Sequence, residues 1–319
     1  MPAQHPVPLR SSARRAYGAT YASAARRCGA CTSVLATLCA APLTAQQSPP
    51  AVTVAGRGPA TYVLISGLVG GVAGYRRLEA RLLEQGYRVV VIDPYQLSLD
   101  SADVSFAALS RRVEAVLAAH HVTRATVVGH AHGAGVALRL AVHAPHHVDA
   151  LYFLDVGALA SHRSPILGST MRLVPLITRL PGGRSFVRRR FVRGLRESAG
   201  RQEWLDAATQ HVYVEPVLGD IGRIVGMVIR LNSAQEPDSL PALVARLRVP
   251  VTVILGDAPH TAGPEAPELA ALAPLGALFR IERMPGVGHF PHEEAPDDLA
   301  RLLGTPRGAS LARYVEGAP

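Results

Sequence analysis

The sequence predicts an α/β fold with a mostly parallel central sheet and helices on both of its faces. From Ala51 onwards, short apolar runs typical of buried strands alternate with segments that have helical spacing. In the middle of this pattern, the β-branched run Ala125–Val128 meets Gly129, and an apolar helical pattern follows the second glycine, Gly133. Of the 319 residues, 48% are hydrophobic, which permits a sizeable core.

The individual elements follow from apolar runs and from the residues that stop them. One helix, for example, carries Leu78, Leu82 and Leu83 on one face and is stopped by Gly86. Strands are expected at 61–66, 88–92, 125–128, 150–154, 250–255 and 277–282. Helices are expected at 74–85, 105–120, 131–143 and 265–272, with a final helix from Asp297.

The N-terminal region does not have the pattern of the fold. Residues 1–27 contain five arginines and no acidic residue, and an apolar stretch runs from Cys31 to Ala45. This order predicts a secretory signal peptide over residues 1–45 and a mature protein that is secreted or periplasmic after cleavage near Ala45. A disordered basic tail is the alternative. The apolar stretch is too short for a transmembrane helix. All three cysteines lie here, so the remaining chain offers no thiol nucleophile.

Between residues 156 and 248 the alternation of strands and helices stops. We expect helical pieces there, broken by Pro165, Pro175, Pro181 and Pro216. The segment holds 14 arginines against 7 acidic residues, and 184–196 alone holds six arginines with apolar residues between them. One interpretation is a basic amphipathic surface for an acidic ligand or an anionic membrane. The other is an ordinary solvated face.

The stretch Val127-Val128-Gly129-His130-Ala131-His132-Gly133-Ala134-Gly135 resembles the nucleophile elbow G-x-S-x-G of the α/β-hydrolase superfamily. The resemblance covers nearly all of residues 51–305 and is to lid-containing, esterase- or lipase-like members. It implies a core formed by residues 46–155 and 249–319, with 156–248 as a helical lid inserted after the sixth strand. Both glycines are expected to flank a turn too tight for side chains. The position of the nucleophile is occupied by Ala131, which cannot attack a substrate.

The same resemblance assigns a base and leaves the acid open. Gly288-His289, followed by Pro291, Glu293 and Pro296, is similar to the late family segment that carries the catalytic histidine, which makes His289 the base. The family usually places its acid in G-x-x-D, but Pro259 stands at that position here. Asp257, two residues earlier, and Asp155, at the end of the preceding core strand, are equal candidates.

An oxyanion hole is implied by two backbone donors. Leu68, after Ser66-Gly67, would supply the first N–H, and His132 at a helix N-terminus would supply the second. Backbone donors do not depend on the side chain, so such a hole can outlast the nucleophile. The alternative is a glycine-rich turn without this role.

Histidines are numerous around these motifs, and a metal that activates water is therefore a further option. His130, His132, His260, His289 and His292 are the residues that could share a face. Because i and i+2 positions on a tight turn diverge and no H-E-x-x-H spacing occurs, we assign no metal ligands, and we predict no cofactor.

Two functions remain in competition. In the first, the protein lacks ordinary serine-hydrolase activity, and the pocket under the lid binds a small apolar or acidic molecule or a partner. In the second, it hydrolyses ester-like substrates with unusual machinery, such as water activated by His289. Nucleic acid is not an expected partner, because the basic segment has no aromatic platform.

Overall fold

The computed structural model describes residues 50–156, 158–161, 169–260, 263 and 266–304. The expected signal peptide, residues 1–45, and Pro165 lie outside the described residues. Residues Ser48–Pro319 form one compact unit, which includes both the predicted core and the predicted insertion. None of the described helices is both long enough and apolar enough to span a membrane.

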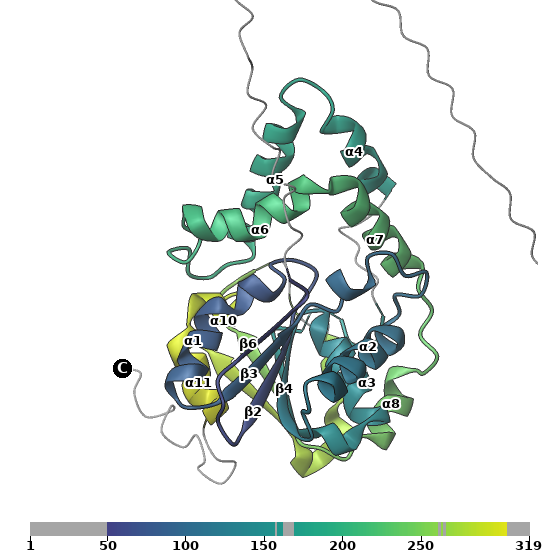
Figure 1. Ribbon diagram of the computed structural model, residues 1–319, viewed down its shortest axis with the longest axis vertical. Helices are drawn as coiled ribbons and strands as arrows, with labels where there is room; N and C mark the ends of the chain where they lie inside the picture. Colours follow the sequence, from purple (N-terminus) through teal and green to yellow (C-terminus); the bar gives the residue numbers. More distant parts are fainter. Residues whose placement is uncertain (1–49, 157, 162–168, 261–262, 264–265, 305–319) are drawn as a thin grey trace, which may run out of the picture. The chain divides into compact units, whose positions relative to one another are not determined.

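A seven-stranded sheet forms the centre of this unit (Figure 1), in the order β1-β3-β2-β4-β5-β6-β7. All neighbouring pairs are parallel except β1 with β3, which confirms the predicted mostly parallel sheet. The sequence does not predict β1, because it is a four-residue edge strand whose residues are all partly exposed or exposed. The bounds are β1 Val52–Ala55, β2 Thr61–Ile65, β3 Arg88–Ile92, β4 Ala125–His130, β5 Val148–Leu154, β6 Val251–Gly256 and β7 Phe279–Met284.

Helices cover both faces of the sheet, because alternate strand residues point to opposite sides. Val63 and Ile65 of β2 belong to an apolar cluster with residues of α2, α3 and α8. Tyr62 and Leu64 of the same strand belong to a second cluster, which includes residues of α1 and α11. The helices of the core are α1 Arg76–Glu84, α2 Phe106–Ala119, α3 Gly133–His143, α9 Ala266–Ala270, α10 Pro291–Glu294 and α11 Pro296–Gly304, with the 3-10 helices η1 Val72–Tyr75, η2 Gln96–Ser98, η3 Pro145–His147 and η6 Ala273–Leu278.

The described part of the segment between β5 and β6 is helical, as predicted. It follows the fifth strand of the described residues in chain order, where the family resemblance implied the sixth. It contains η5 Ser169–Leu173, α4 Val174–Ile177, α5 Gly183–Glu197, α6 Ala207–Gly219, α7 Ile221–Ser233 and α8 Leu240–Arg246.

Two of the expected proline breaks are wrong. Pro216 lies inside α6, because the buried Tyr213, Val214 and Leu218 hold the helix on both sides of it, and this packing outweighs the lost N–H. Pro175 lies at the start of α4, where its missing N–H costs nothing. The break near Pro181 is present, since Gly182 has a left-handed φ of 73° immediately before α5 begins.

A buried ion pair connects the insertion to the core. Glu236, which follows α7, accepts from Arg139 Nε of α3 at 2.8 Å. The same carboxylate accepts from the backbone N–H groups of Phe106 and Ala107, the first two residues of α2, at 2.6 and 3.3 Å. The Arg139 guanidinium also donates to the backbone oxygens of Gly135, Leu159 and Ala160. One acidic side chain therefore neutralises a buried arginine and caps a core helix.

Candidate active site

The turn between β4 and α3 has the geometry that the glycine pattern predicts. A Cβ on Gly129 would lie 2.6 Å from the Gly133 backbone oxygen, and one on Gly133 would lie 2.4 Å from the Ile65 backbone oxygen. Ala131, between them, has a φ of 49°, which is rare for a residue with a side chain. Its N–H donates to the Leu154 carbonyl at the end of β5, at 3.0 Å. The turn is therefore a sharp, strained one, and Ala131 stands at its apex.

His289 and Asp155 meet beside this turn. His289 Nδ1 lies 2.7 Å from Asp155 Oδ2, and both side chains are almost completely buried. Asp155 directly follows β5 and has a φ of 39°, while its backbone N–H donates to Ile254 of β6. Of the two predicted acids, the structure brings Asp155 to His289. Asp257 instead accepts from the Gly286 N–H at 2.5 Å and makes no contact of this kind with the histidine.

A second histidine shares the same carboxylate oxygen. His260 Nε2 lies 2.9 Å from Asp155 Oδ2, and its Nδ1 donates to the Ala258 carbonyl at 2.7 Å. Burial raises the pKa of Asp155, but the hydrogen bonds from the two histidines outweigh this, and the pKa lies below its ordinary value. The bond to Asp155 raises the pKa of His260. The sequence gives one indication of this arrangement: Pro259 stands where the family usually has its acid, and His260 follows it.

The loop that carries His289 is fixed by Glu294. Its Oε2 accepts from the N–H groups of Gly200, Arg201 and Gly288 at 2.8–2.9 Å, and its Oε1 accepts from Phe290 at 3.0 Å. Because Gly200 and Arg201 follow α5, one carboxylate joins the insertion to the histidine loop. The His289 N–H itself donates to Ser198 at the end of α5, at 2.8 Å.

Glu293, which the late motif emphasises, has a different role from its neighbour. Its side chain is fully buried and pairs with Arg76 and Arg77 of α1, at 2.8 and 3.2 Å. Burial raises its pKa to about 7, although the two arginines act in the opposite direction. Glu294 therefore performs the loop-organising role that the sequence did not assign to it, because adjacent carboxylates cannot be distinguished by spacing alone.

The predicted oxyanion segments both border Ala131. A Cβ on Gly67 would lie 3.4 Å from the Ala131 Cβ and 3.3 Å from the His130 carbonyl, so the loop that carries Leu68 passes directly beside the turn. His132 stands at the N-cap of α3, where backbone N–H groups lack partners within the helix. The two predicted donors thus belong to two segments that border Ala131.

The five histidines that could have shared a metal do not converge. His130, His289 and His292 form one group, with the His130 ring 4.7 and 4.4 Å from the other two ring centres. His130 Nε2 lies 2.8 Å from the His289 backbone oxygen. Burial lowers the pKa of His130 well below its usual value and that of His292 to about 3, so both rings are neutral. His132 is directed toward Phe106 instead.

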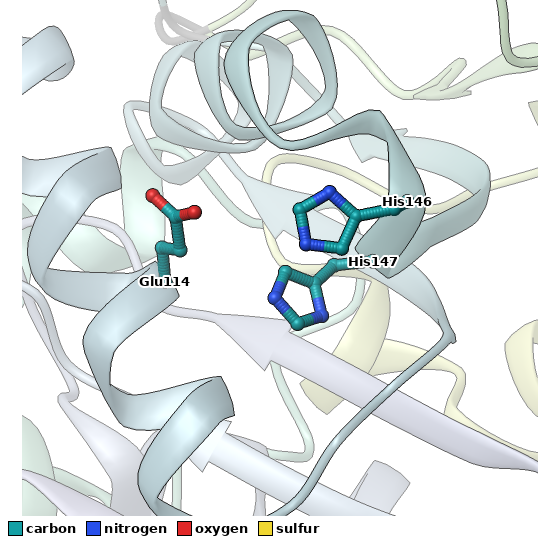
Figure 2. A group of neighbouring side chains, drawn as sticks. All are labelled: Glu114, His146 and His147. Atoms are coloured by element: carbon teal, nitrogen blue, oxygen red, sulfur yellow. The ribbon is translucent and has the colours of Figure 1, made fainter.

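Within the part of the chain that the structure describes, two groups of side chains have the spacing of metal ligands. In the first, Asp155, His260 and His289 offer ligand atoms within 4.8 Å of one another, but their hydrogen bonds already account for this closeness. The second consists of Glu114 on α2 with His146 and His147 on η3 (Figure 2). It lies at the surface, and Glu114 Oε2 is engaged with His143 at 2.9 Å.

Comparison with known proteins identifies the fold and the family. The model of the family described as "Alpha/beta hydrolase family" matches residues 62–302. Among solved structures, Cfl2 from Burkholderia cenocepacia has a TM-score of 0.60 and 24% identity, covering 79% of this chain and 90% of that one. A structure described as a membrane phospholipase A has a TM-score of 0.62 and 20% identity, covering 79% and 80%. At these identities the likeness concerns the fold.

Curated proteins are similar in sequence as well. The "sn-1-specific diacylglycerol lipase ABHD11" of Mus musculus is 22% identical over 261 residues, which are 74% of this chain and 77% of that protein. The "Putative carbamate hydrolase RutD" of Cronobacter turicensis is 37% identical over 103 residues. That second match spans 31% of this chain and only 38% of the relative.

Proposed function

This chain belongs to the α/β-hydrolase family, and we propose that it is a member that binds a small apolar or acidic molecule of ester-like shape without serine chemistry. The observation that carries the proposal is Ala131 at the apex of the strained turn, with a φ of 49°. A serine there would have its hydroxyl beside the oxyanion segments, whereas a methyl group offers no nucleophile. On this proposal the segment of residues 156–248 acts as the lid over the ligand.

The apolar character of the proposed ligand is supported by the residues around His289. Phe290 packs against Trp204 and against Tyr213 of α6, with ring centres 5.0 and 5.9 Å apart. The His289 ring itself lies 5.0 Å from Phe290. Aromatic side chains from the insertion therefore pack against the histidine loop and make its surroundings apolar, as is usual for sites that take apolar ligands.

The test is whether a single substitution restores hydrolysis. We expect the purified full chain to be silent on short-chain nitrophenyl esters and Ala131→Ser to be active, because His289 and Asp155 are already paired at 2.7 Å. Loss of activity in Ala131→Ser/His289→Ala would show that the new serine uses this base. Burst kinetics with the nitrophenyl ester would report the acyl-enzyme.

Variants that carry Ala131→Ser also distinguish the two predicted acids. Ala131→Ser/Asp155→Asn should lose roughly 10⁴-fold in kcat, since the histidine would no longer be held in the right tautomer. Ala131→Ser/Asp257→Asn is the matched control and should keep its activity, because Asp257 contacts the Gly286 backbone instead. The opposite ranking would refute Asp155 as the acid, and silence of Ala131→Ser with an intact fold would show that more than the nucleophile is missing. Hydrolysis by the unaltered chain would refute the proposal itself.

A second function is favoured by the intact pair of His289 and Asp155. With no serine present, His289 could accept a proton from water as that water attacks the substrate carbonyl, and the oxyanion segments would stabilise the intermediate. This candidate predicts esterase activity in the unaltered chain that His289→Ala abolishes and Ala131→Ser increases. It also predicts linear initial product release without a burst, since no acyl-enzyme forms.

A further inference from the structure

The four most exposed large apolar side chains in the described part of the chain lie close together in sequence, in the first half of the insertion. Leu173, Leu176, Leu180 and Phe186 are 54–58% exposed, whereas the other three exposed large apolar residues reach only 39–40%. They belong to η5, α4, the α4–α5 turn and the first turn of α5, which lie at one end of the drawn ribbon (Figure 1). Exposure of this extent on one short segment is typical of an interaction surface.

The same segment has a large positive charge. Residues 171–196 contain eight arginines and no acidic residue. Two of the eight pair with acids, Arg188 with Glu215 and Arg190 with Glu197. The guanidinium groups of the other six have no ion-pair or hydrogen-bond partner among the described residues, and all six residues are exposed; they are Arg172, Arg179, Arg184, Arg189, Arg193 and Arg196. Six exposed arginines without an ion-pair partner among the described residues therefore share this segment with the exposed leucines and phenylalanine.

The helix α5 separates its anchoring face from its free face. Val192 and Leu195 are buried in the third apolar cluster with Trp204 and Tyr213, which fixes α5 to α6. Phe186 and the unpaired arginines lie outside that contact. A helix whose buried side is already satisfied, and whose remaining surface combines arginines with a bulky apolar residue, has the composition of an interfacial helix.

We propose that residues 171–196 form a docking tip for an anionic phospholipid bilayer, with the four apolar side chains inserted among the acyl chains and the six arginines on the lipid phosphates. Charge complementarity selects this occupant, because a neutral apolar partner would leave six cations unpaired. Apolar insertion distinguishes the tip from a purely basic patch, whose binding would vanish at high salt. The proposal concerns where the protein lies and is independent of whether an ester is hydrolysed.

The experiment is cosedimentation of the full chain with vesicles of phosphatidylglycerol and phosphatidylcholine, compared with vesicles of phosphatidylcholine alone. We expect binding to the anionic vesicles that weakens, but is not abolished, at high salt. Arg184→Gln/Arg189→Gln/Arg193→Gln should lower the affinity on the order of 100-fold, at roughly fivefold per arginine. Leu176→Ser/Leu180→Ser/Phe186→Ser should remove the salt-resistant part.

Matched control variants have the same types of substitution, arginine to glutamine and apolar residue to serine, at exposed positions of the core. Arg57→Gln/Arg111→Gln/Arg283→Gln removes three exposed arginines there, and Leu278→Ser/Ile281→Ser removes two exposed apolar side chains. Both controls should bind like the unaltered chain. If the core and tip arginine variants lose affinity equally, the binding is nonspecific and the proposal is overturned.

Hydrogen exchange on the unaltered chain gives a second readout that needs no variant. The proposal predicts that anionic vesicles protect residues 171–196, whereas binding through the basic residues 1–27 alone would leave them unprotected and refute it. Protection of 171–196 that depends on protein concentration without vesicles, together with a larger mass by light scattering, would show that a second copy of the chain occupies the tip instead.

Discussion

At the scale of single residues, the turn around Ala131 depends on the absence of two side chains. Gly133 has the least room, because its missing Cβ would press on the backbone of Ile65 and Ser66 at 2.4 and 2.7 Å. These are backbone atoms of a central strand and of the residue after it, so they cannot move aside as a flexible side chain would. The position is therefore restricted by space, since its φ is not in the left-handed region.

We predict that Gly133→Ala lowers the free energy of unfolding by at least about 1–3 kcal/mol, the usual cost of forcing extra volume into a packed site. Gly194→Ala, on α5, is the control, because nothing lies within 4 Å of the place that a Cβ would take there. It should stabilise the protein by up to about 1 kcal/mol through helix propensity. Urea denaturation of both variants measures the difference, and equal effects would contradict the spatial argument.

A second residue-scale prediction concerns His292. Its ring is buried against Tyr75 with ring centres 4.7 Å apart, and burial lowers its pKa to about 3. The unfolded chain binds a proton at about pH 6.5. Stability from the neutral ring is thus fully present above pH 6.5 and is lost as the pH falls toward 3, by an amount on the order of a few kcal/mol.

His292→Phe should remove this part of the acid sensitivity while keeping the ring contact. We expect the unfolding midpoint of the unaltered chain to fall faster than that of His292→Phe between pH 6.5 and pH 4, as measured by thermal unfolding. Parallel curves would mean that the folded ring accepts the proton. Burial also lowers the pKa of His130, which is present in both proteins, so some acid sensitivity persists in each.

At the scale of elements, the strands and core helices were predictable because each has an apolar pattern of its own. The helices after Gly74 and Ser105 and the strands from Thr61, Arg88 and Pro250 all form within a few residues of their expected bounds. The short strand β1 was not predictable, since its existence depends on pairing with β3. The predicted helix break at Pro216 was wrong, because the packing of α6 outweighs the low helix propensity of proline at that position.

The candidate site also has parts that local sequence patterns predict and parts that they do not. The turn at Ala131 and the position of His289 follow from local glycine and histidine patterns. The choice between Asp155 and Asp257 does not, because it depends on how β5 and β6 place two distant segments side by side. The roles of His260 and Glu294 were missed for the same reason. His260 contacts Asp155, 105 positions away, and Glu294 contacts Gly200, 94 positions away, in addition to its own loop. Sequence spacing carries no information about such contacts.

At the scale of the whole molecule, Glu236 and Glu294 are two of the acidic side chains that hold the insertion to the core. The pair of Glu236 and Arg139 is the more enclosed contact, with side chains only 6% and 4% exposed. Removing one charge would leave the other buried without compensation, which is far more costly than losing an exposed pair. The junction should therefore limit the stability of the compact unit.

We predict that Glu236→Gln costs about 3–5 kcal/mol of unfolding free energy, as expected for breaking a buried pair. Asp238→Asn, two residues later, removes the partner of Arg246 in a largely exposed pair and should cost about 1 kcal/mol or less. Chemical denaturation compares the two. A similar small effect for both would show that water reaches Arg139 when its partner is neutral.

The turn at Ala131 also has a consequence for how the protein can evolve. Ala131 has a strained φ, and the flanking positions Gly129 and Gly133 have no room for a side chain, although the alanine methyl group has no need of this geometry. Alanine codons and one family of serine codons differ by a single base. A point mutation in the DNA would thus place a hydroxyl at an apex already shaped for it, with no second substitution needed to reshape the backbone.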